Sequence, residues 1–256
     1  MKNKLTLVKV GGQIVEEPET LKQLLNDFSN LEGHKVLVHG GGRAATRIAG
    51  QLGIESKMVN GRRVTDADML QVVTMVYGGL VNKQIVAGLQ ALNVNALGLT
   101  GADMNYMRSE KRPVKDVDYG FVGDVKEVNA DILASLINEG VVPVLAPLTH
   151  DKQGNLLNTN ADTIAGEAAK ALAQYFDVTL MFCFEKKGVL RNPDDEDSMI
   201  PEITKPAFDA FVADGTIQGG MIPKLENAFE AIAAGVKEVI ISKADEIGKG
   251  TGTVVK

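Results

Sequence analysis

The sequence predicts an α/β protein, a three-layer αβα sandwich with a mainly parallel open sheet. The first observation is an alternation of short apolar runs, typical of buried strands, with segments whose apolar residues recur at helical spacing. The second is that several apolar runs end in glycine, where a strand gives way to a loop. Such an order requires crossover connections and therefore parallel strands covered on both faces. We expect one domain over residues 1–256, with an N-terminal lobe of about 1–174 and a C-terminal lobe of about 175–256.

The composition is that of an ordinary globular protein, with 45% hydrophobic and 23% charged residues among 256. The net charge of −6 argues against a general surface for nucleic acid or an anionic membrane. No run approaches about 18 uninterrupted apolar residues, and no apolar signal core precedes the first strand pattern at Leu5. The single cysteine, Cys183, has no partner for a disulfide within the chain. We therefore expect a cytoplasmic protein that acts on small molecules.

The first predicted strand, residues 5–12, carries a charge to the edge of the sheet. It reads LTLVKVGG, an apolar run that stops at Lys9, Gly11 and Gly12. The two glycines let the backbone turn sharply and leave its N–H groups available to an anion beside the lysine ammonium. This pattern indicates a phosphate site; the alternative is a lysine that is simply solvated at a strand end.

A second glycine-rich loop follows the next strand. Residues 19–31 have apolar side chains at helical spacing, residues 35–38 return to a strand pattern, and residues 43–52 predict another helix. The loop at 39–42 reads HGGG, and its N–H groups, together with the helix N-terminus, can hold negative charge. The alternative is a tight turn that only permits close packing. We expect His39 to be a structural, hydrogen-bonding residue, because nothing at a fixed spacing supplies an orienting carboxylate.

Residues 57–65, which read KMVNGRRVT, predict a β-hairpin with Asn60 and Gly61 at its turn. Arg62 and Arg63 are neighbours on the returning strand, so strand alternation sends their side chains to opposite faces. An inward guanidinium near the HGGG loop would match a substrate carboxylate. The alternative is two solvated arginines on an exposed edge.

The middle of the chain continues the alternation of elements. Residues 66–92 predict a long helix with Thr65 as its N-cap, and its stripe of Met and Val side chains indicates core packing or a subunit contact. A dimer is consistent with this stripe. Residues 108–123 are polar and loop-like, with a turn near a cleft around Gly120 and Gly123. The other elements expected here are a strand at 96–99, a helix at 129–138 and a strand at 141–145.

A polar loop precedes the next predicted helix, at 163–174. Residues 156–162 read LLNTNAD, in which Asn160 or Asp162 can cap that helix. The functional interpretation is that the loop aims amides and a carboxylate at a ligand, and that Asp162 holds nearby cations by charge-assisted hydrogen bonds.

The last third of the chain contains a second lysine beside glycines. Residues 217–225 read IQGGMIPKL and place Lys224 shortly after two glycines. The acidic residues at 194–197 indicate a solvated loop, because the EF-hand pattern is absent. The other elements expected here are a buried strand at 178–184, a loop at 185–190, a helix at 225–234, a strand at 238–242 and a tail at 250–255.

Taken together, the motifs resemble those of a known family. The chain lacks G-x-x-x-x-G-K-[ST] and G-x-G-x-x-G, the phosphate-binding signatures of P-loop NTPases, Rossmann dehydrogenases and protein kinases. Its order and spacing resemble the amino acid kinase family nearly end to end, and within it the enzymes that phosphorylate N-acetylglutamate. The motifs are KVGG at 9–12, HGGG at 39–42, NGRRVT at 60–65, LNTNAD at 157–162 and GGMIPKL at 219–225.

The resemblance implies a fold and a set of site residues. The fold would be that of amino acid kinases and carbamate kinases, with acyl-amino-acid binding and dimerisation in the N-terminal lobe and nucleotide binding in the C-terminal lobe. Lys9 and Lys224 would flank the transferred phosphoryl group, with Asp162 as organiser. The implied acceptor-binding residues are Gly41, Gly42, Arg63 and Asn158, and the implied nucleotide-binding residues are Gly11, Gly12, Glu185, Lys186, Gly188, Leu190 and Gly220.

The implied reaction is ATP-dependent phosphorylation of the γ-carboxylate of N-acetyl-L-glutamate, or of a close N-acylglutamate such as N-succinylglutamate, in arginine biosynthesis. ATP and Mg²⁺ would be the cofactors. Lysines on the attacking and leaving sides would stabilise charge as it spreads, and no strong base is required because a carboxylate is already ionised at neutral pH. Magnesium would be held largely by nucleotide phosphates and water, so we expect no metal site made of protein side chains alone.

The chain departs from the family pattern in two places. After the strand at 178–184 the family usually has Ser or Thr, then Asp, before a glycine, whereas residues 184–188 here read FEKKG, which affects the contacts expected for adenine and ribose. The chain also begins directly at its first strand, without the extra N-terminal helix of arginine-sensitive hexameric relatives. We therefore expect a homodimer without arginine feedback.

Two alternatives to this function stay open. Another kinase of the family, acting on carbamate, uridylate or glutamate, is the enzymatic one, and the pairing of Arg63 with Asn158 argues against it. A non-catalytic ligand sensor on the same fold is the other.

Overall fold

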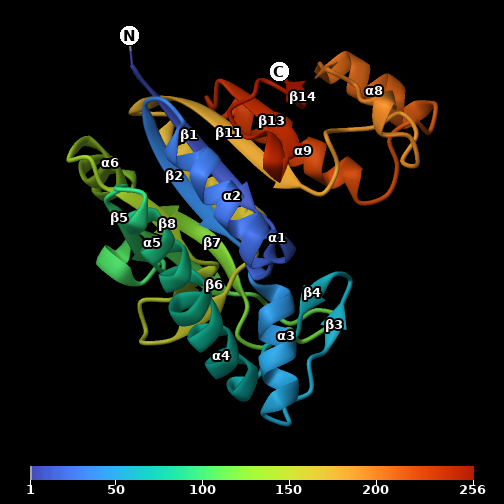
Figure 1. The fold of residues 1–256 in the computed structure, drawn as a ribbon. Coiled ribbons are helices and arrows are strands. Elements are labelled where there is room, and N and C mark those ends of the chain that lie inside the picture. Colours follow the sequence, from blue (N-terminus) through green and yellow to red (C-terminus); the bar gives the residue numbers. More distant parts are fainter. Residues whose placement is uncertain (1) are drawn as a thin grey trace.

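The computed structural model describes residues 2–256 and is built on an eight-stranded sheet (Figure 1). The strand order is β12-β14-β13-β11-β1-β2-β8-β5, and all neighbouring pairs are parallel except β13 with β14. The expected mainly parallel open sheet is thus confirmed. The strands are β1 (Asn3–Val10), β2 (His34–His39), β5 (Ala96–Leu99), β8 (Val142–Leu145), β11 (Phe176–Phe184), β12 (Glu202–Ile203), β13 (Glu238–Lys243) and β14 (Thr253–Val255).

Helices cover both faces of this sheet, and each face has its own apolar core. Alternation along β1 sends Leu5 and Leu7 into one core and Val8 and Val10 into the other. Lys9 is two residues after Leu7, so its side chain is on the same face of β1 as Leu5 and Leu7, the face that α7 covers. On that face pack α6 (Ala130–Asn138), α7 (Ala161–Leu172) and α9 (Met221–Ala233); on the other pack α1 (Gly12–Glu16), α2 (Pro18–Ser29), α3 (Gly42–Gln51), α4 (Ala67–Val73) and α5 (Asn82–Ala91).

Smaller elements lie at the two ends of the main sheet. Figure 1 shows α3 with the β3–β4 hairpin below the sheet, and α8 with α9 at the upper right. The hairpin confirms the turn expected at Asn60 and Gly61, both of which have positive φ. These elements are β3 (Met58–Val59), β4 (Arg62–Arg63) and α8 (Lys205–Ala213).

The expectation of a polar loop at 108–123 is partly wrong, because both ends of this segment belong to strands. A second sheet, in the order β10-β9-β6-β7, takes one strand from its start and another from its end. The charged residues that suggested a loop face solvent and pair across the strands, as Arg108 does with Glu127 at 3.1 Å, while Ser109 is buried. The strands are β6 (Met107–Lys111), β7 (Gly123–Val128), β9 (Leu148–His150) and β10 (Leu156–Asn158).

The expected long helix at 66–92 is present, but it is not uniform. Asp66, rather than Thr65, is its N-cap, because the Asp66 carboxylate accepts a hydrogen bond from the backbone N–H of Met69 at 2.8 Å. Between α4 and α5 the residues Thr74–Val81 form a π-helical segment, η1. Such segments change the helical period and are frequent at functional sites. The remaining short helices are η2 (Asp103–Asn105), η3 (Glu196–Ser198) and η4 (Ala244–Glu246).

By length and composition alone, the continuous helix at 67–91 would be apolar enough to cross a bilayer, with a mean hydropathy of 1.3. However, 44% of its most apolar window is buried inside the protein, where it packs against α2, α3 and β5. Core helices of globular proteins have the same properties. The helix therefore gives only weak support for a membrane span.

Candidate active site

Two cavities lie at the carboxyl ends of the central strands. The larger has a volume of about 920 Å³ and extends from the end of β1 to α9. Six of the seven residues expected to bind nucleotide line it, and Lys224 does so as well. Gly220, the seventh, is the N-cap of α9 and lies outside this lining. The six are Gly11, Gly12, Glu185, Lys186, Gly188 and Leu190.

The smaller cavity has a volume of about 200 Å³. All four residues expected to bind the acceptor, Gly41, Gly42, Arg63 and Asn158, line it. Gly42 lines both cavities, so the two spaces meet at the HGGG loop. Ligands of open parallel sheets bind at such a place, outside the carboxyl ends of strands where the order of the chain reverses.

Lys9 and Asp162 form an ion pair beside this junction. Lys9 is buried, with 7% of its surface exposed, and its Nζ lies 2.6 Å from Oδ1 of Asp162. The N-cap of α7 is Asn160, whose side chain accepts hydrogen bonds from the N–H groups of Asp162 and Thr163. Because Asn160 caps the helix, the Asp162 carboxylate is left to hold the lysine. The sequence left open whether Asn160 or Asp162 caps α7, and the structure shows that Asn160 does.

Lys224 comes near this ion pair from α9 and lines the larger cavity. It lies in the first turn of that helix, whereas the sequence had placed it in the turn before the helix. Its Nζ is 3.7 Å from the centre of the Phe184 ring, and Nζ of Lys9 is 5.4 Å from the same point. Burial lowers the pKa of Lys224 and the nearby Lys9 lowers it further, while Asp162 opposes the shift. Two lysines that are far apart in the sequence therefore meet at one aromatic ring, and Asp162 pairs with one of them.

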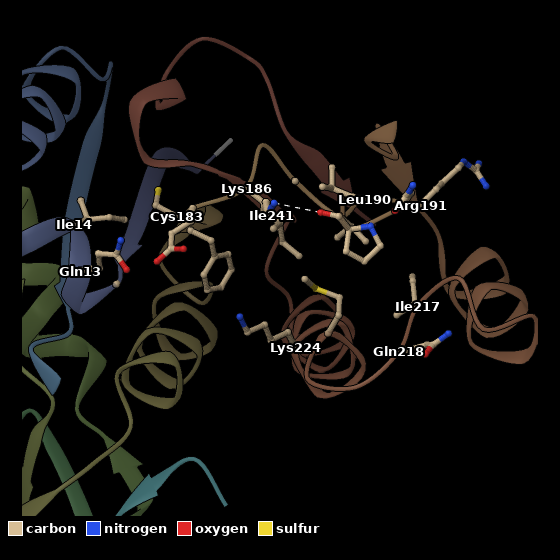
Figure 2. Close-up of a pocket in the computed structure, with 18 of the residues that line it drawn as sticks. Gln13, Ile14, Cys183, Lys186, Leu190, Arg191, Ile217, Gln218, Lys224 and Ile241 are labelled. Atoms are coloured by element: carbon tan, nitrogen blue, oxygen red, sulfur yellow. Dashed lines mark hydrogen bonds between the residues drawn. The ribbon is translucent and has the colours of Figure 1, made fainter. Parts of the chain in front are cut away.

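Figure 2 shows how the larger cavity is arranged around Lys224. The Lys224 side chain extends from α9 toward the side where Gln13 and Cys183 lie, and Ile217 and Gln218 lie on the opposite side. Lys186 donates a hydrogen bond to the carbonyl of Pro193 at 3.2 Å, which ties the loop after β11 to the next segment. Apolar walls with a few charged groups suit a nucleotide.

The glycines are required because two backbones approach each other. The Gly40 N–H donates to the carbonyl of Val10 at 3.0 Å. A Cβ at Gly40 would lie 2.9 Å from the backbone nitrogen of Gly12, and one at Gly12 would lie 3.1 Å from that of Gly41. The loops after β1 and β2 are thus packed together, and α3 begins there without a side-chain cap. Its first N–H groups are available to an anion.

Arg63 points inward and Arg62 is exposed, as one of the two sequence interpretations expected. Arg63 is 8% exposed and donates hydrogen bonds to the carbonyl of Gly42 at 2.7 Å and to Oγ1 of Thr46 at 2.9 Å. It also donates to the hydroxyl of Ser56. These contacts hold the guanidinium fork at the wall of the smaller cavity.

Sequence reasoning missed Tyr77, which comes from the π-helical segment and lines the smaller cavity. Its ring packs so closely on the HGGG loop that a Cβ at Gly41 would lie 2.9 Å from it. Burial raises the pKa of Tyr77, and Arg63 opposes the shift. In the sequence, Tyr77 is one more large residue on an apolar helix, so no pattern distinguished it.

His39 is a structural residue, as expected. It is completely buried, and its Nδ1 lies 2.7 Å from the carbonyl of Gly40, which fixes the proton on that nitrogen. Its Nε2 then accepts a hydrogen bond from the side-chain amide of Asn82 at 3.1 Å. Burial lowers the pKa of His39 to about 4, so the imidazole is neutral at physiological pH. It supports the glycine loop from beneath.

Comparisons with known proteins agree over nearly the whole chain. The sequence profile of the Amino acid kinase family matches residues 4–243. An acetylglutamate kinase of Parabacteroides distasonis is 77% identical over 98% of this chain and 99% of that protein. One of Bacteroides thetaiotaomicron is 73% identical over the full length of both.

Solved structures show the same fold. The crystal structure of smu.665 from Streptococcus mutans has a TM-score of 0.80 and 31% identity, with 98% of each chain covered. The carbamate kinase from Giardia lamblia bound to AMP-PNP has a TM-score of 0.71 at 16% identity, again with 98% of each chain covered, which shows the fold alone.

Proposed function

The chain belongs to the amino acid kinase family, and from this we propose that it phosphorylates the γ-carboxylate of N-acetyl-L-glutamate with ATP, as a step of arginine biosynthesis in the cytoplasm. The relatives at 73% and 77% identity carry the name acetylglutamate kinase. The single observation that carries the proposal is the gathering of Lys9, Asp162 and Lys224: Asp162 directly follows residues that line the smaller cavity, and Lys224 lines the larger one.

The larger cavity takes ATP in this proposal. The base and ribose lie among the apolar side chains of the C-terminal lobe, and the phosphates extend toward the N–H groups of Gly11 and Gly12. Gly188 and Leu190 line the wall, while Glu185 and Lys186 belong to the segment 184–188, which departs from the family's Ser or Thr followed by Asp. Shape and apolar contact therefore contribute more to nucleotide binding than a dedicated side-chain hydrogen bond.

The smaller cavity takes the acylated amino acid. The Arg63 guanidinium pairs with the α-carboxylate, and the Asn158 amide, which donates to Oγ1 of Thr65 at 2.9 Å, also lines this cavity. The N–H groups of Gly41 and Gly42 stand at the end where this cavity joins the larger one. The γ-carboxylate of a glutamate held by its α-carboxylate points toward this junction.

At the junction, an oxygen of the γ-carboxylate forms a bond to the γ-phosphorus of ATP as the bond from that phosphorus to the β,γ-bridging oxygen breaks. ADP leaves with the electron pair, and the product is an acyl phosphate. No proton moves, because the carboxylate is already ionised. Lys9 and Lys224 stabilise the negative charge that spreads over the transferring oxygens, and Asp162 keeps Lys9 in place.

Magnesium enters with the nucleotide in this proposal. Among residues 2–256, no group of three or more His, Cys, Asp or Glu side chains is placed to hold a metal ion. The carboxylates beside the cavities are Asp162, which is already paired with Lys9, and Glu185, which is largely exposed. This set fits an ion that is held by phosphates and water. When bound, Mg²⁺ neutralises charge on the β- and γ-phosphates.

We further propose that the protein is a homodimer that associates through the N-terminal lobe. β5 is an edge strand, and apolar side chains near it are exposed. η1 contacts the same edge, since a Cβ at Gly78 would touch Thr100 directly after β5. An apolar patch at an open sheet edge requires cover. The exposed residues are Met75, Leu80, Leu97 and Met104.

Light scattering after size exclusion tests the dimer. We expect about twice the chain mass of 27.3 kDa. The double variant Met75→Lys and Leu97→Lys should shift the mass to that of one chain, while Leu52→Lys, an exposed apolar residue at the C-terminus of α3, should leave it unchanged. A wild-type monomer or hexamer would contradict the proposal.

A kinase assay with Mg-ATP tests the reaction. N-acetylglutamate, N-succinylglutamate, glutamate, aspartate and carbamate are compared, and the acyl phosphate is trapped with hydroxylamine. We expect turnover with an N-acylglutamate and little with the free amino acids. Binding of N-acetylglutamate and ATP without turnover would favour the ligand sensor instead, and turnover with carbamate would favour another reaction of the family.

A further inference from the structure

Phe184 occupies an unusual position, with both lysines of the junction near its ring. It is the last residue of β11, and the centre of its ring is 3.7 Å from Nζ of Lys224 and 5.4 Å from Nζ of Lys9. An ammonium within about 6 Å of a ring centre is attracted by the negative face of the aromatic system. One side chain thus contacts the two cations that the proposed reaction requires.

The two lysines differ in what balances their charge. Lys9 has the Asp162 carboxylate at 2.6 Å. Lys224 is half-buried, and within residues 2–256 no carboxylate lies within 4.0 Å of its Nζ. Two like charges repel, and a half-buried ammonium has lost part of its hydration. The Asp162 charge acts on Lys224 from beyond that distance, and the face of Phe184 is in direct contact with its Nζ.

The ring is held firmly enough to act as a platform. Phe184 stacks on Phe182, two residues earlier on the same face of β11, with ring centres 6.2 Å apart and planes inclined by 14°. Phe182 is buried in the core beneath, and β11 is hydrogen-bonded to β1 and β13 on its two sides. The orientation of the Phe184 ring is thereby set by the sheet.

We propose that Phe184 is a positioning residue, whose ring holds the Lys224 ammonium at the junction of the two cavities without neutralising it. A carboxylate in the same place would hold Lys224 more strongly, but it would cancel the positive charge that the phosphates need. An aromatic face attracts a cation and leaves its charge uncompensated. This inference rests on the proposed phosphoryl transfer, and it assigns a role to the position where the sequence departs from the family pattern.

Kinetics of matched variants test the positioning role. Phe184→Leu removes the ring but keeps an apolar side chain, and it should lower kcat at least tenfold with little change in the KM of the acylglutamate. Phe184→Tyr keeps the ring and should stay within about threefold of the wild type. Phe182→Leu is the control, because it removes the stacked neighbour, which has no lysine over it, while the strand pairing of β11 still holds Phe184; it should lower the melting temperature and reduce kcat far less than Phe184→Leu.

A double variant separates positioning from general packing. When Lys224→Ala is already present, Phe184→Leu should change kcat by less than twofold, because the group that the ring positions is gone. Equal losses in the two backgrounds would overturn the inference. So would a Phe184→Leu enzyme with wild-type kcat.

A measurement without turnover tests the contact itself. Lysines are reductively methylated with ¹³C-formaldehyde, and the Lys224 signal is assigned with Lys224→Arg. A dimethylammonium above an aromatic ring should resonate upfield of the solvent-exposed lysines, and Phe184→Leu should remove this shift while Phe182→Leu keeps it. An unshifted Lys224 signal in the wild type would overturn the inference even if the enzyme is active. Lack of wild-type turnover would contradict the proposed function and the positioning role together. The NMR signal would still report whether the ring contacts Lys224.

Discussion

The two cavities are built on different principles. The smaller one has a wall of buried groups that are already fixed by the protein, since Arg63 is 8% exposed and hydrogen-bonded to Gly42, Thr46 and Ser56. The wall of the larger one includes charged groups that are loosely held: Arg43 and Glu185 each have 64% of the side chain exposed and are 3.9 Å apart. An exposed pair at that distance contributes little.

This difference indicates that substrate selectivity resides in the smaller cavity. A fixed fork of donors recognises one arrangement of carboxylate, and it discriminates strongly because its buried groups are left unpaired by a wrong ligand. A large, mostly apolar cavity accepts a base and ribose mainly by shape. We therefore expect changes at the junction to affect turnover most, changes in the smaller cavity to affect acceptor binding, and changes at the rim of the larger cavity to affect little.

The largest effect is expected at the junction. Lys9→Ala and Lys224→Ala should each reduce kcat by roughly 10²–10³-fold, the loss typical of removing one preorganised group that stabilises charge in the transition state. Lys186→Ala is the matched control, because Lys186 lines the larger cavity but its Nζ contacts the carbonyl of Pro193. Steady-state kinetics with both substrates provide the measurement. If Lys186→Ala reduced kcat as much, then Lys9 and Lys224 would contribute no more to catalysis than another lysine of the larger cavity.

The next largest effect is expected on acceptor binding in the smaller cavity alone. Arg63→Ala should raise the KM of the acylglutamate about 100-fold, or roughly 2.7 kcal/mol, and leave the KM of ATP within about threefold. Arg47→Ala, which removes an exposed arginine of α3 that lines neither cavity, is the control and should change the acceptor KM by less than threefold. If the KM of ATP rose as much as that of the acceptor, the two cavities would not be separate binding sites.

The sequence predicts the central sheet well, because the sheet depends on local patterns. Apolar runs that end in lysine or glycine mark the strands, and parallel strands bring their carboxyl ends to one edge. That is why Lys9 and the HGGG loop could be placed together from sequence. The inward direction of Arg63, rather than Arg62, was one of two possibilities that strand alternation allowed, and only the packing of Arg63 against α3 decides between them.

The rest of the structure depends on contacts that are distant in sequence. The strand at Met107–Lys111 was hidden because its charged residues pair with β7, and the π-helical segment was hidden because one altered turn does not change the apolar stripe. Tyr77 and Phe184 look like core residues until the elements that carry them meet Gly41 and Lys224. Sequence periodicity reports which face a residue lies on, not what it meets there.

A smaller effect should come from the backbone contact that joins the cavities. Gly12→Ala places a Cβ 3.1 Å from the nitrogen of Gly41, which should lower stability by about 1–3 kcal/mol and raise the KM of both substrates. Gly11→Ala is the matched control, because its Cβ would have no atom of the protein within 4 Å. Thermal unfolding of the two variants without ligands gives the comparison. Equal melting temperatures would show that the two loops can separate at no cost.

The smallest effect concerns the support beneath the smaller cavity and is seen as a pH dependence of stability. His39 has a pKa of about 4 in the folded protein, below its ordinary value of 6.5, because it is buried. Between these values the unfolded chain binds more protons than the folded one, so the free energy of unfolding falls as the pH drops below 6.5. The expected loss between pH 7.5 and 5.5 is roughly 1 kcal/mol from this group.

Urea unfolding at several pH values measures that loss, and His39→Gln should reduce the pH slope by the same amount. His34→Gln is the control, because His34 stands at the start of the same strand and is only half-buried. Turnover should show no step near pH 6.5 that His39→Gln removes, since the buried imidazole donates to Gly40 and accepts from Asn82 in its neutral form throughout that range. Such a step would mean that the glycine loop opens during the reaction, and the smaller cavity would then be as adaptable as the larger one.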